Sequence, residues 1–112
     1  MSTDIYRGSG WGKSWVGICK DGYIYAGHGW SRTVVGMYRE GDVYRGSGWG
    51  KEWIGSYRDG DVYSGHGWSR TRVGTYGSGD IYQGSGWGKR LVGVYTGPDG
   101  GAAAAALLLL LV

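Results

Sequence analysis

The chain has 112 residues, including 26 Gly, 10 Tyr, 7 Trp, one Pro and no Phe, and a formal net charge of +3. Glycine at this level without a strict triplet period excludes collagen, and the regularly placed Tyr, Val and Ile argue against a disordered chain. The single Cys19 excludes an internal disulfide, and the mild positive charge permits an anionic partner without requiring one.

A 19-residue repeat runs through the chain five times. Its phrase, Asp-Ile/Val-Tyr-x-Gly-Ser/His-Gly-Trp, starts at residues 4, 23, 42, 61 and 80, with Tyr23 in place of Asp. Such a period indicates one structural unit that is copied along the chain. We therefore divide the chain into a five-repeat β domain, residues 1–96, and a Gly/Pro linker with an Ala/Leu tail, residues 97–112.

Each copy is predicted to form a β-hairpin. In the third copy, residues 53–58 and 61–65 are rich in β-forming residues and flank an Asp-Gly pair, which is a strong hairpin signal. A two-residue loop would place Tyr57 opposite Val62 and mix aromatic with aliphatic side chains on each face.

A three-residue loop with Gly60 in the left-handed region sorts the faces more cleanly, and we expect this register. It places Gly55 opposite Tyr63, so that the Tyr ring covers the bare glycine backbone. One face would then carry Trp53, Gly55, Tyr57, Tyr63 and Gly65, and the other Ile54, Ser56, Arg58, Val62 and Ser64. The same pairing recurs as Gly17 with Tyr25, Gly36 with Tyr44 and Gly74 with Tyr82.

Two rows of β-branched residues supply a thin core, with each side chain worth about 1.5–3 kcal/mol when fully buried. We predict an all-β fold, an antiparallel meander of about ten short strands in a curved or closed sheet that brings these rows together. A homodimeric sandwich would cover them as well. The rows are Val16, Val35, Ile54, Val73 and Val92, and Ile5, Ile24, Val43, Val62 and Ile81.

The linkers between the strands carry the candidate ligand-binding residues. They read Gly-Ser-Gly-Trp-Gly-Lys in copies one, three and five and Gly-His-Gly-Trp-Ser-Arg in copies two and four, so the full period is 38 residues. Each cation could stack on its own Trp, or the Trp could plug the end of the sheet. Aromatic rings beside positive charge also suit sugars, phosphate-bearing headgroups or single-stranded nucleic acid. The residues are Trp11, Lys13, Trp30, Arg32, Trp49, Lys51, Trp68, Arg70, Trp87 and Lys89.

No catalytic, metal or cofactor site is expected. His28 and His66 lack Cys or acidic partners at metal-binding spacing, and no nucleophile–base pair stands out. Cys19 takes the place of Tyr38 and its equivalents, which indicates a small apolar filler. The start of the chain shows no signal peptide, which predicts a cytoplasmic protein.

The tail is a breaker cluster, residues 97–101, followed by five Ala, five Leu and Val112. These residues are excellent helix formers, but 11 apolar residues span only about 16 Å, too short to cross a bilayer. We expect the tail to be a separate appendage.

The phrase Tyr57-Arg58-Asp59-Gly60-Asp61-Val62-Tyr63-Ser64-Gly65 resembles the core of MORN repeats, in which Asp-Gly-x-x-Tyr-x-Gly links two short strands. It returns at residues 21–27, and with Glu40-Gly41 before Tyr44 and Gly46. The unit here is shorter than a MORN unit, and Gly-x-Gly-Trp replaces Gly-x-Trp. The resemblance implies a sheet that acts as a scaffold, a dimerisation surface or a contact for anionic lipid.

Taken together, these patterns favour a non-enzymatic β-repeat module that binds or assembles through its repeated Trp and Lys/Arg surfaces. The alternative is a multivalent carbohydrate-binding protein, in which Trp rings stack on sugar faces. The candidate partners are a second copy of the chain, a carbohydrate, and an anionic lipid or phosphate; nucleic acid is less favoured.

Overall fold

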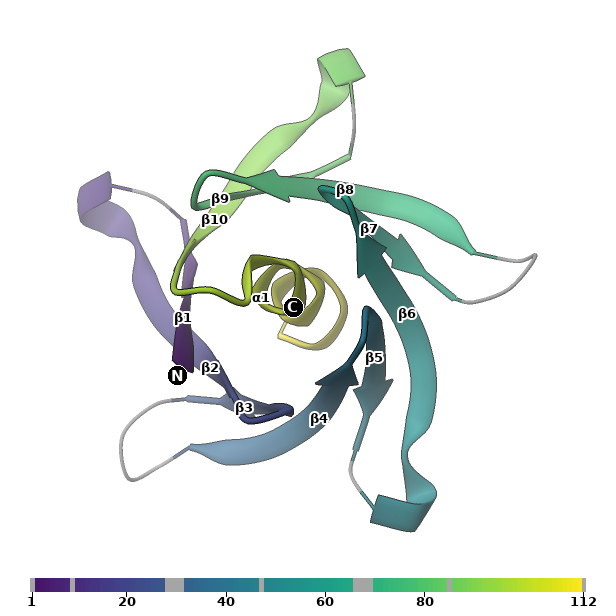
Figure 1. Ribbon diagram of the computed structural model, residues 1–112. Helices are drawn as coiled ribbons and strands as arrows, with labels where there is room; N and C mark the ends of the chain where they lie inside the picture. The colour runs from purple at the N-terminus through teal and green to yellow at the C-terminus, as the bar shows by residue number, and fades with distance from the viewer. Residues whose placement is uncertain are drawn as a thin grey trace.

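The computed structural model describes residues 2–8, 10–27, 32–46, 48–65, 70–84 and 86–111. Ten antiparallel strands follow one another around a closed barrel, and the last strand pairs with the first (Figure 1). The predicted meander is confirmed, in its closed form. The strands are β1 (Ser2–Arg7), β2 (Ser14–Lys20), β3 (Tyr23–Ala26), β4 (Thr33–Arg39), β5 (Asp42–Arg45), β6 (Glu52–Arg58), β7 (Asp61–Ser64), β8 (Thr71–Gly77), β9 (Asp80–Gln83) and β10 (Arg90–Thr96).

The hairpins use two-residue turns, so the predicted three-residue register is wrong. Tyr57 lies opposite Val62 and Arg58 opposite Asp61, which leaves only Asp59 and Gly60 in the turn. Both turn residues have positive φ, 51° and 90°, as a type I′ turn requires. This turn matches the right-handed twist of the strands, and that match outweighs the tidier sorting of side chains that a longer loop would give.

A β-bulge in every repeat corrects the predicted faces. Between β5 and β6 the register shifts so that Ile54 is the extra residue, next to Gly55. The bulge lets Ile54, Gly55 and Tyr57 all face the barrel interior with Val62, whereas Tyr63 points outward. Tyr63 therefore does not lay its ring across Gly55; a Cβ on Gly55 would instead meet the Tyr63 backbone carbonyl.

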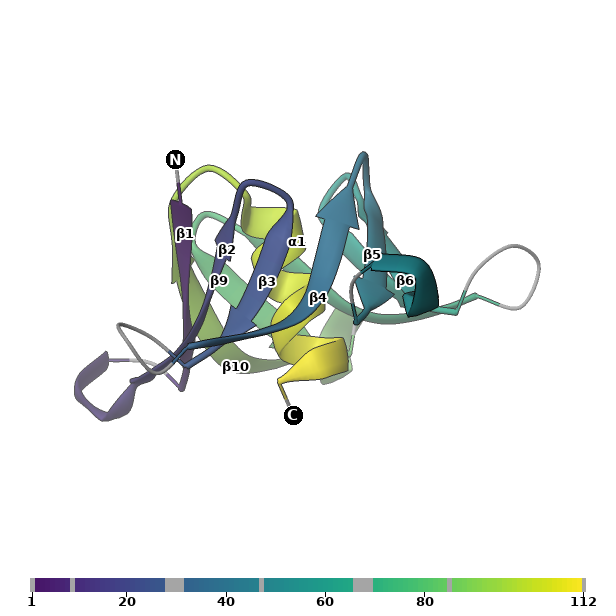
Figure 2. The same ribbon diagram turned by 90° about the horizontal axis from the view of Figure 1, so that it is seen from below.

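The tail lies inside the barrel, so the expectation of a separate appendage is wrong. After β10 the chain turns inward, forms the α-helix α1 (Gly100–Ala105) and continues as the π-helix η6 (Ala106–Leu110) along the barrel axis (Figures 1 and 2). Ala102 to Ala106 are fully buried. The tail thus covers the two aliphatic rows that looked too thin to hold a sheet together.

Side-chain volumes on the barrel and on the tail are complementary. Near the hairpin turns the barrel supplies Tyr rings and the tail supplies Gly: a Cβ on Gly100 would lie 2.5 Å from the Tyr95 ring. Near the linkers the pattern reverses, because the barrel supplies Gly and the tail supplies Leu. Large groups facing small ones give the dense packing of protein interiors.

Each of the five leucines packs against the bulge glycine of a different repeat, in reverse chain order. A Cβ added to the glycine would lie 2.6 to 2.9 Å from the Leu Cδ1 in four of the pairs and would clash with Leu107 in the fifth. The η6 backbone has the i→i+5 pattern of a π-helix, with the Leu111 N–H donating to the Ala106 carbonyl at 2.8 Å. Successive leucines along this helix therefore face successive repeats of the barrel. The pairs are Leu107 with Gly93, Leu108 with Gly74, Leu109 with Gly55, Leu110 with Gly36 and Leu111 with Gly17.

The tail crosses into the barrel beside the first repeat. The Asp99 N–H donates to Thr3 Oγ1 at 2.8 Å, and the Tyr38 hydroxyl donates to Asp99 Oδ2 at 3.0 Å. Cys19, which pairs with Thr3 across the sheet, is fully buried where the other repeats carry Tyr. A small residue at this place fits the point where the chain passes inward.

Candidate binding surface at the linker end

The two ends of the barrel differ in structure. The two-residue turns form one end, the turn end. The described residues of the linkers form the other, the linker end; the linkers are residues 8–13, 27–32, 46–51, 65–70 and 84–89 of the sequence. The tail runs from the turn end to the linker end, where the chain also finishes (Figure 2). The candidate ligand-binding residues that the structure describes all lie at the linker end, as the alternation of strand directions dictates.

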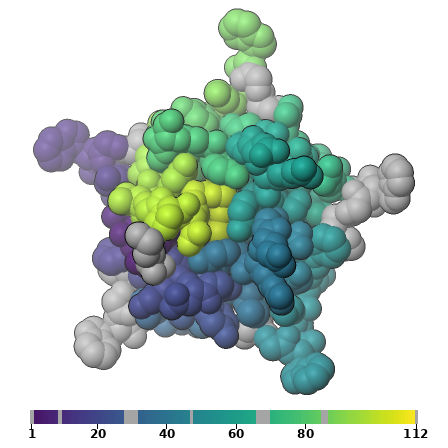
Figure 3. All heavy atoms as spheres, in the orientation of Figure 1, coloured from purple at the N-terminus to yellow at the C-terminus, as the bar shows by residue number. Residues whose placement is uncertain are grey.

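The described linkers project outward and carry Trp at their tips. Three short 3₁₀ turns, η1 (Gly10–Gly12), η3 (Gly48–Gly50) and η5 (Gly86–Gly88), have Trp as the middle residue. The exposed fractions of Trp11, Trp49 and Trp87 are 106%, 106% and 107%, so these rings touch almost nothing in the chain. They therefore do not plug the end of the sheet. We call them the arm tryptophans. Figure 3 shows coloured segments of the chain that project from the body of the barrel like arms.

The linker cations stack on tyrosines, and in the three linkers whose Trp the structure describes they do not stack on that Trp, which corrects one of the two structural interpretations for these linkers. Lys51 Nζ lies 5.0 Å from the Tyr44 ring centre, and the Arg70 guanidinium lies 4.7 Å from that of Tyr63. Each contact is worth about 0.5–1 kcal/mol at such an exposed place. The other pairs are Lys13 with Tyr6, Arg32 with Tyr25 and Lys89 with Tyr82.

Two further tryptophans lie on the outer wall of the barrel and were not among the predicted site residues. Trp15 and Trp53 stand opposite Tyr6 and Tyr44 on the neighbouring strands. Each indole N–H donates to a backbone carbonyl, of Gly17 at 3.1 Å or of Gly55 at 3.0 Å, which fixes the ring against the wall. Trp15 and Trp53 are 38 residues apart, in copies one and three, and this spacing could have identified them as a pair of related surface residues; copy five has Leu91 at the equivalent position.

The charged side chains are strongly segregated between the two ends. Nine of the twelve Lys and Arg residues, but only one of the nine Asp and Glu residues, Glu52, lie at or beside the linkers. The side-chain charge is therefore +8 at the linker end and −5 at the turn end. This asymmetry is hidden by the net charge of +3. The cations are Arg7, Lys13, Arg32, Arg45, Lys51, Arg70, Arg72, Lys89 and Arg90.

The titratable groups with shifted pKa values lie in the barrel interior, away from the linkers. Burial raises the pKa of the Cys19 thiol and of the Tyr38 and Tyr76 hydroxyls, and it raises the pKa of Tyr57 to about 12. These groups stay protonated at neutral pH and serve packing. Within the described ranges, no three His, Cys, Asp or Glu residues cluster in a way that could hold a metal ion.

The structure thus brings the linker cations to one end of the barrel, whereas the arm tryptophans belong to three separate linkers. Trp30, Trp68, His28 and His66 lie outside the described residues. Among the helices of the described chain, none is long and apolar enough to cross a membrane.

Comparisons with known proteins do not place this chain in a family. A scan against protein families finds no match, and searches of curated proteins and of solved structures find none either. The MORN-like character of the hairpins stays a prediction.

Proposed function

We propose that this protein is a non-enzymatic binding module that attaches to an anionic surface through its linker end. The observation that carries the proposal is the coincidence, at one end of one barrel, of a +8 charge with three fully exposed indole rings. An exposed Trp costs free energy in water, and the packing of the barrel does not need these rings. A surface of negative phospholipid headgroups would attract the cations and admit indole rings at the headgroup level.

Binding of an external partner is favoured over self-assembly because the chain's own tail completes the core. The aliphatic rows suggested that a second copy could be needed to cover them. In the barrel the tail covers them, with Ile5, Ile24, Val43, Val62 and Ile81 all fully buried. Among the described residues, the large apolar side chains that stay exposed lie on the outer wall and the arms, where an external partner can reach them.

The test is co-sedimentation with phosphatidylcholine vesicles that contain or lack phosphatidylserine. We expect binding only to the anionic vesicles. Lys51→Gln with Lys89→Gln at the linker end should weaken it roughly tenfold or more, since each cation near such a surface is worth about 1 kcal/mol. The matched control is Arg39→Gln with Arg58→Gln at the turn end, which removes the same charge and should leave binding unchanged. Equal losses from both pairs would contradict the proposal.

A multivalent carbohydrate-binding function is the second candidate, favoured by the spacing of Trp11, Trp49 and Trp87. Each ring stands alone on its own linker, 38 residues from the next, as repeated weak sugar sites would require. A glycan array would decide: sugar binding that is lost in Trp11→Ala/Trp49→Ala/Trp87→Ala and is insensitive to the Lys51 and Lys89 variants would favour this function over the first.

A further inference from the structure

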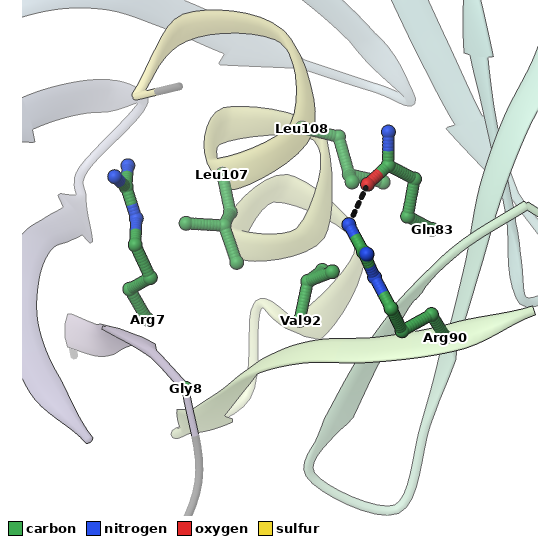
Figure 4. Close-up of a pocket in the computed structure, with 7 residues that line it drawn as sticks. All are labelled: Arg7, Gly8, Gln83, Arg90, Val92, Leu107 and Leu108. Carbon is green, nitrogen blue, oxygen red and sulfur yellow. Dashed lines mark hydrogen bonds between the residues drawn. The ribbon is translucent and has the colours of Figure 1, made fainter. Parts of the chain in front are cut away.

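A cavity of about 450 Å³ opens at the linker end, over the last strand. Its floor is apolar, formed by Val92 and by Leu107 and Leu108 of the tail, and Gly8 also lines it (Figure 4). The guanidinium groups of Arg7 and Arg90 stand on either side of this floor. The cavity therefore combines an apolar surface with two positive charges.

The repeats provide an internal comparison for this cavity. A cavity of about 390 Å³ occupies the equivalent place over β6, again with tail leucines in its floor. There the positions of Arg90, Gln83 and Arg7 are taken by Glu52, Arg45 and Ser64. The shape is thus a property of the repeat, whereas the pair of arginines is particular to the place over β10.

The remaining three strands confirm the singular charge of this place. Over β2, β4 and β8 the residue equivalent to Arg90 is Ser14, Thr33 or Thr71, and the flanking positions hold at most one Arg. Two guanidinium groups without a neighbouring acid therefore occur once in five equivalent positions. The closing pair of strands, β1 and β10, creates this combination because it brings the first and fifth repeats together.

The two arginines are available to a ligand. Arg90 Nη2 donates to Gln83 Oε1 at 3.4 Å, a long bond that orients the group without neutralising it. Within the described part of the chain, neither Arg7 nor Arg90 forms an ion pair with an acidic side chain. Guanidinium groups present a planar fork of N–H donors that matches the two oxygens of a carboxylate.

We propose that the cavity over β10 binds a small amphipathic carboxylate, such as a medium-chain fatty acid. The carboxylate accepts hydrogen bonds from Arg7 and Arg90, and the alkyl chain lies on Val92, Leu107 and Leu108. This site differs from the surface attachment proposed above, because it uses neither the arm tryptophans nor the cations that stack on Tyr, although Arg7 and Arg90 also contribute to the +8 charge of the linker end.

Sodium octanoate is added to the full chain, and its binding is measured from the NMR chemical shifts of the Leu107 and Leu108 methyl groups. We expect saturable shifts with octanoate, and much weaker ones with acetate, which lacks the chain, or octanol, which lacks the charge. Arg90→Glu, which copies Glu52, and Arg7→Ser, which copies Ser64, should each weaken octanoate binding at least about tenfold, the loss expected for a charge-assisted hydrogen bond. The matched control, Arg45→Ser, should leave binding unchanged.

A gain-of-site experiment makes the proposal sharper. Glu52→Arg with Ser64→Arg and Arg45→Gln reproduces the β10 combination over β6 and should add a second octanoate site, seen as new shifts at the Leu109 methyls. Equal binding of octanol and octanoate, unchanged affinity in Arg90→Glu, or no saturable shift in the unaltered chain would each overturn the proposal. If the Lys51→Gln/Lys89→Gln variant loses vesicle binding but still binds octanoate, the octanoate proposal is supported.

Discussion

The leucines of the tail and the arm tryptophans are both large apolar side chains beside glycine, but their surroundings are opposite. Each Leu from Leu107 to Leu111 packs against one bulge glycine of the barrel, whereas Trp11, Trp49 and Trp87 are fully exposed. Burial of apolar surface is what stabilises a fold. Stability therefore depends on the tail, whereas the arms are free to serve another purpose.

The largest effect is expected from removing the tail. A chain that ends at Thr96 would expose the fully buried Ile5, Ile24, Val43, Val62 and Ile81 to the empty interior. We expect the cooperative unfolding transition to disappear, as measured by circular dichroism in urea. A truncated chain with the same transition midpoint as the full chain would show that the barrel does not need its tail.

Glycine substitutions compare the two regions directly. A Cβ at Gly55 would meet the Tyr63 carbonyl and lie 2.7 Å from Leu109 Cδ1, whereas a Cβ at Gly50 on the arm has nothing within 4 Å. Gly55→Ala should lower the free energy of unfolding by about 1–3 kcal/mol, as overpacking does. Gly50→Ala should be close to neutral. Similar losses from both variants in urea unfolding would remove the distinction between core and arm.

High pH should weaken the turn end of the core. Burial raises the pKa of Tyr57 to about 12 from its ordinary value near 10, so the folded state holds this proton more tightly than the unfolded state. The stabilisation is complete below pH 10 and is lost as the pH rises towards 12. Urea unfolding at pH 8 to 11 should show a falling free energy of unfolding, with a shallower fall in Tyr57→Phe. An identical slope in the variant would argue that Tyr57 is not buried.

The smallest effect on stability is expected at the arms. The triple variant Trp11→Ala/Trp49→Ala/Trp87→Ala removes three rings that contact almost nothing, so its unfolding midpoint should equal that of the original chain. The vesicle or glycan assay should nevertheless register the change. A clear drop in the midpoint would mean that the indoles belong to the packed structure.

The overall fold was largely readable from the sequence, whereas its register was not. Repeats, alternating β-rich runs and Asp-Gly pairs are local signals, and they predict the hairpins and the meander. The bulge at Ile54 interrupts the two-residue alternation from which the faces of a strand are assigned. An Asp-Gly pair such as Asp59-Gly60 is compatible with both a two-residue and a three-residue loop, so it does not determine the length of the turn. Both depend on the twist of the closed barrel, which is a property of the whole chain.

The sequence of the tail also indicates its buried position. A helix that is apolar all round is typical of a buried position. Five consecutive leucines equal the number of repeats, and each repeat has one bulge glycine. The linkers were predicted more successfully as a cationic, tryptophan-rich end, but the stacking of Lys51 and its equivalents on Tyr44 and its equivalents depends on which residues cross-strand pairing brings together.

Nuclear Overhauser contacts between the leucine methyls and the bulge glycines test directly whether the tail fills the barrel. The structure predicts Leu109 methyl contacts with the Gly55 α-protons, Leu108 with Gly74 and Leu110 with Gly36, one leucine for each repeat in reverse order. Leucine methyls with random-coil shifts and no contact to these glycines would contradict a barrel that is filled by its own tail.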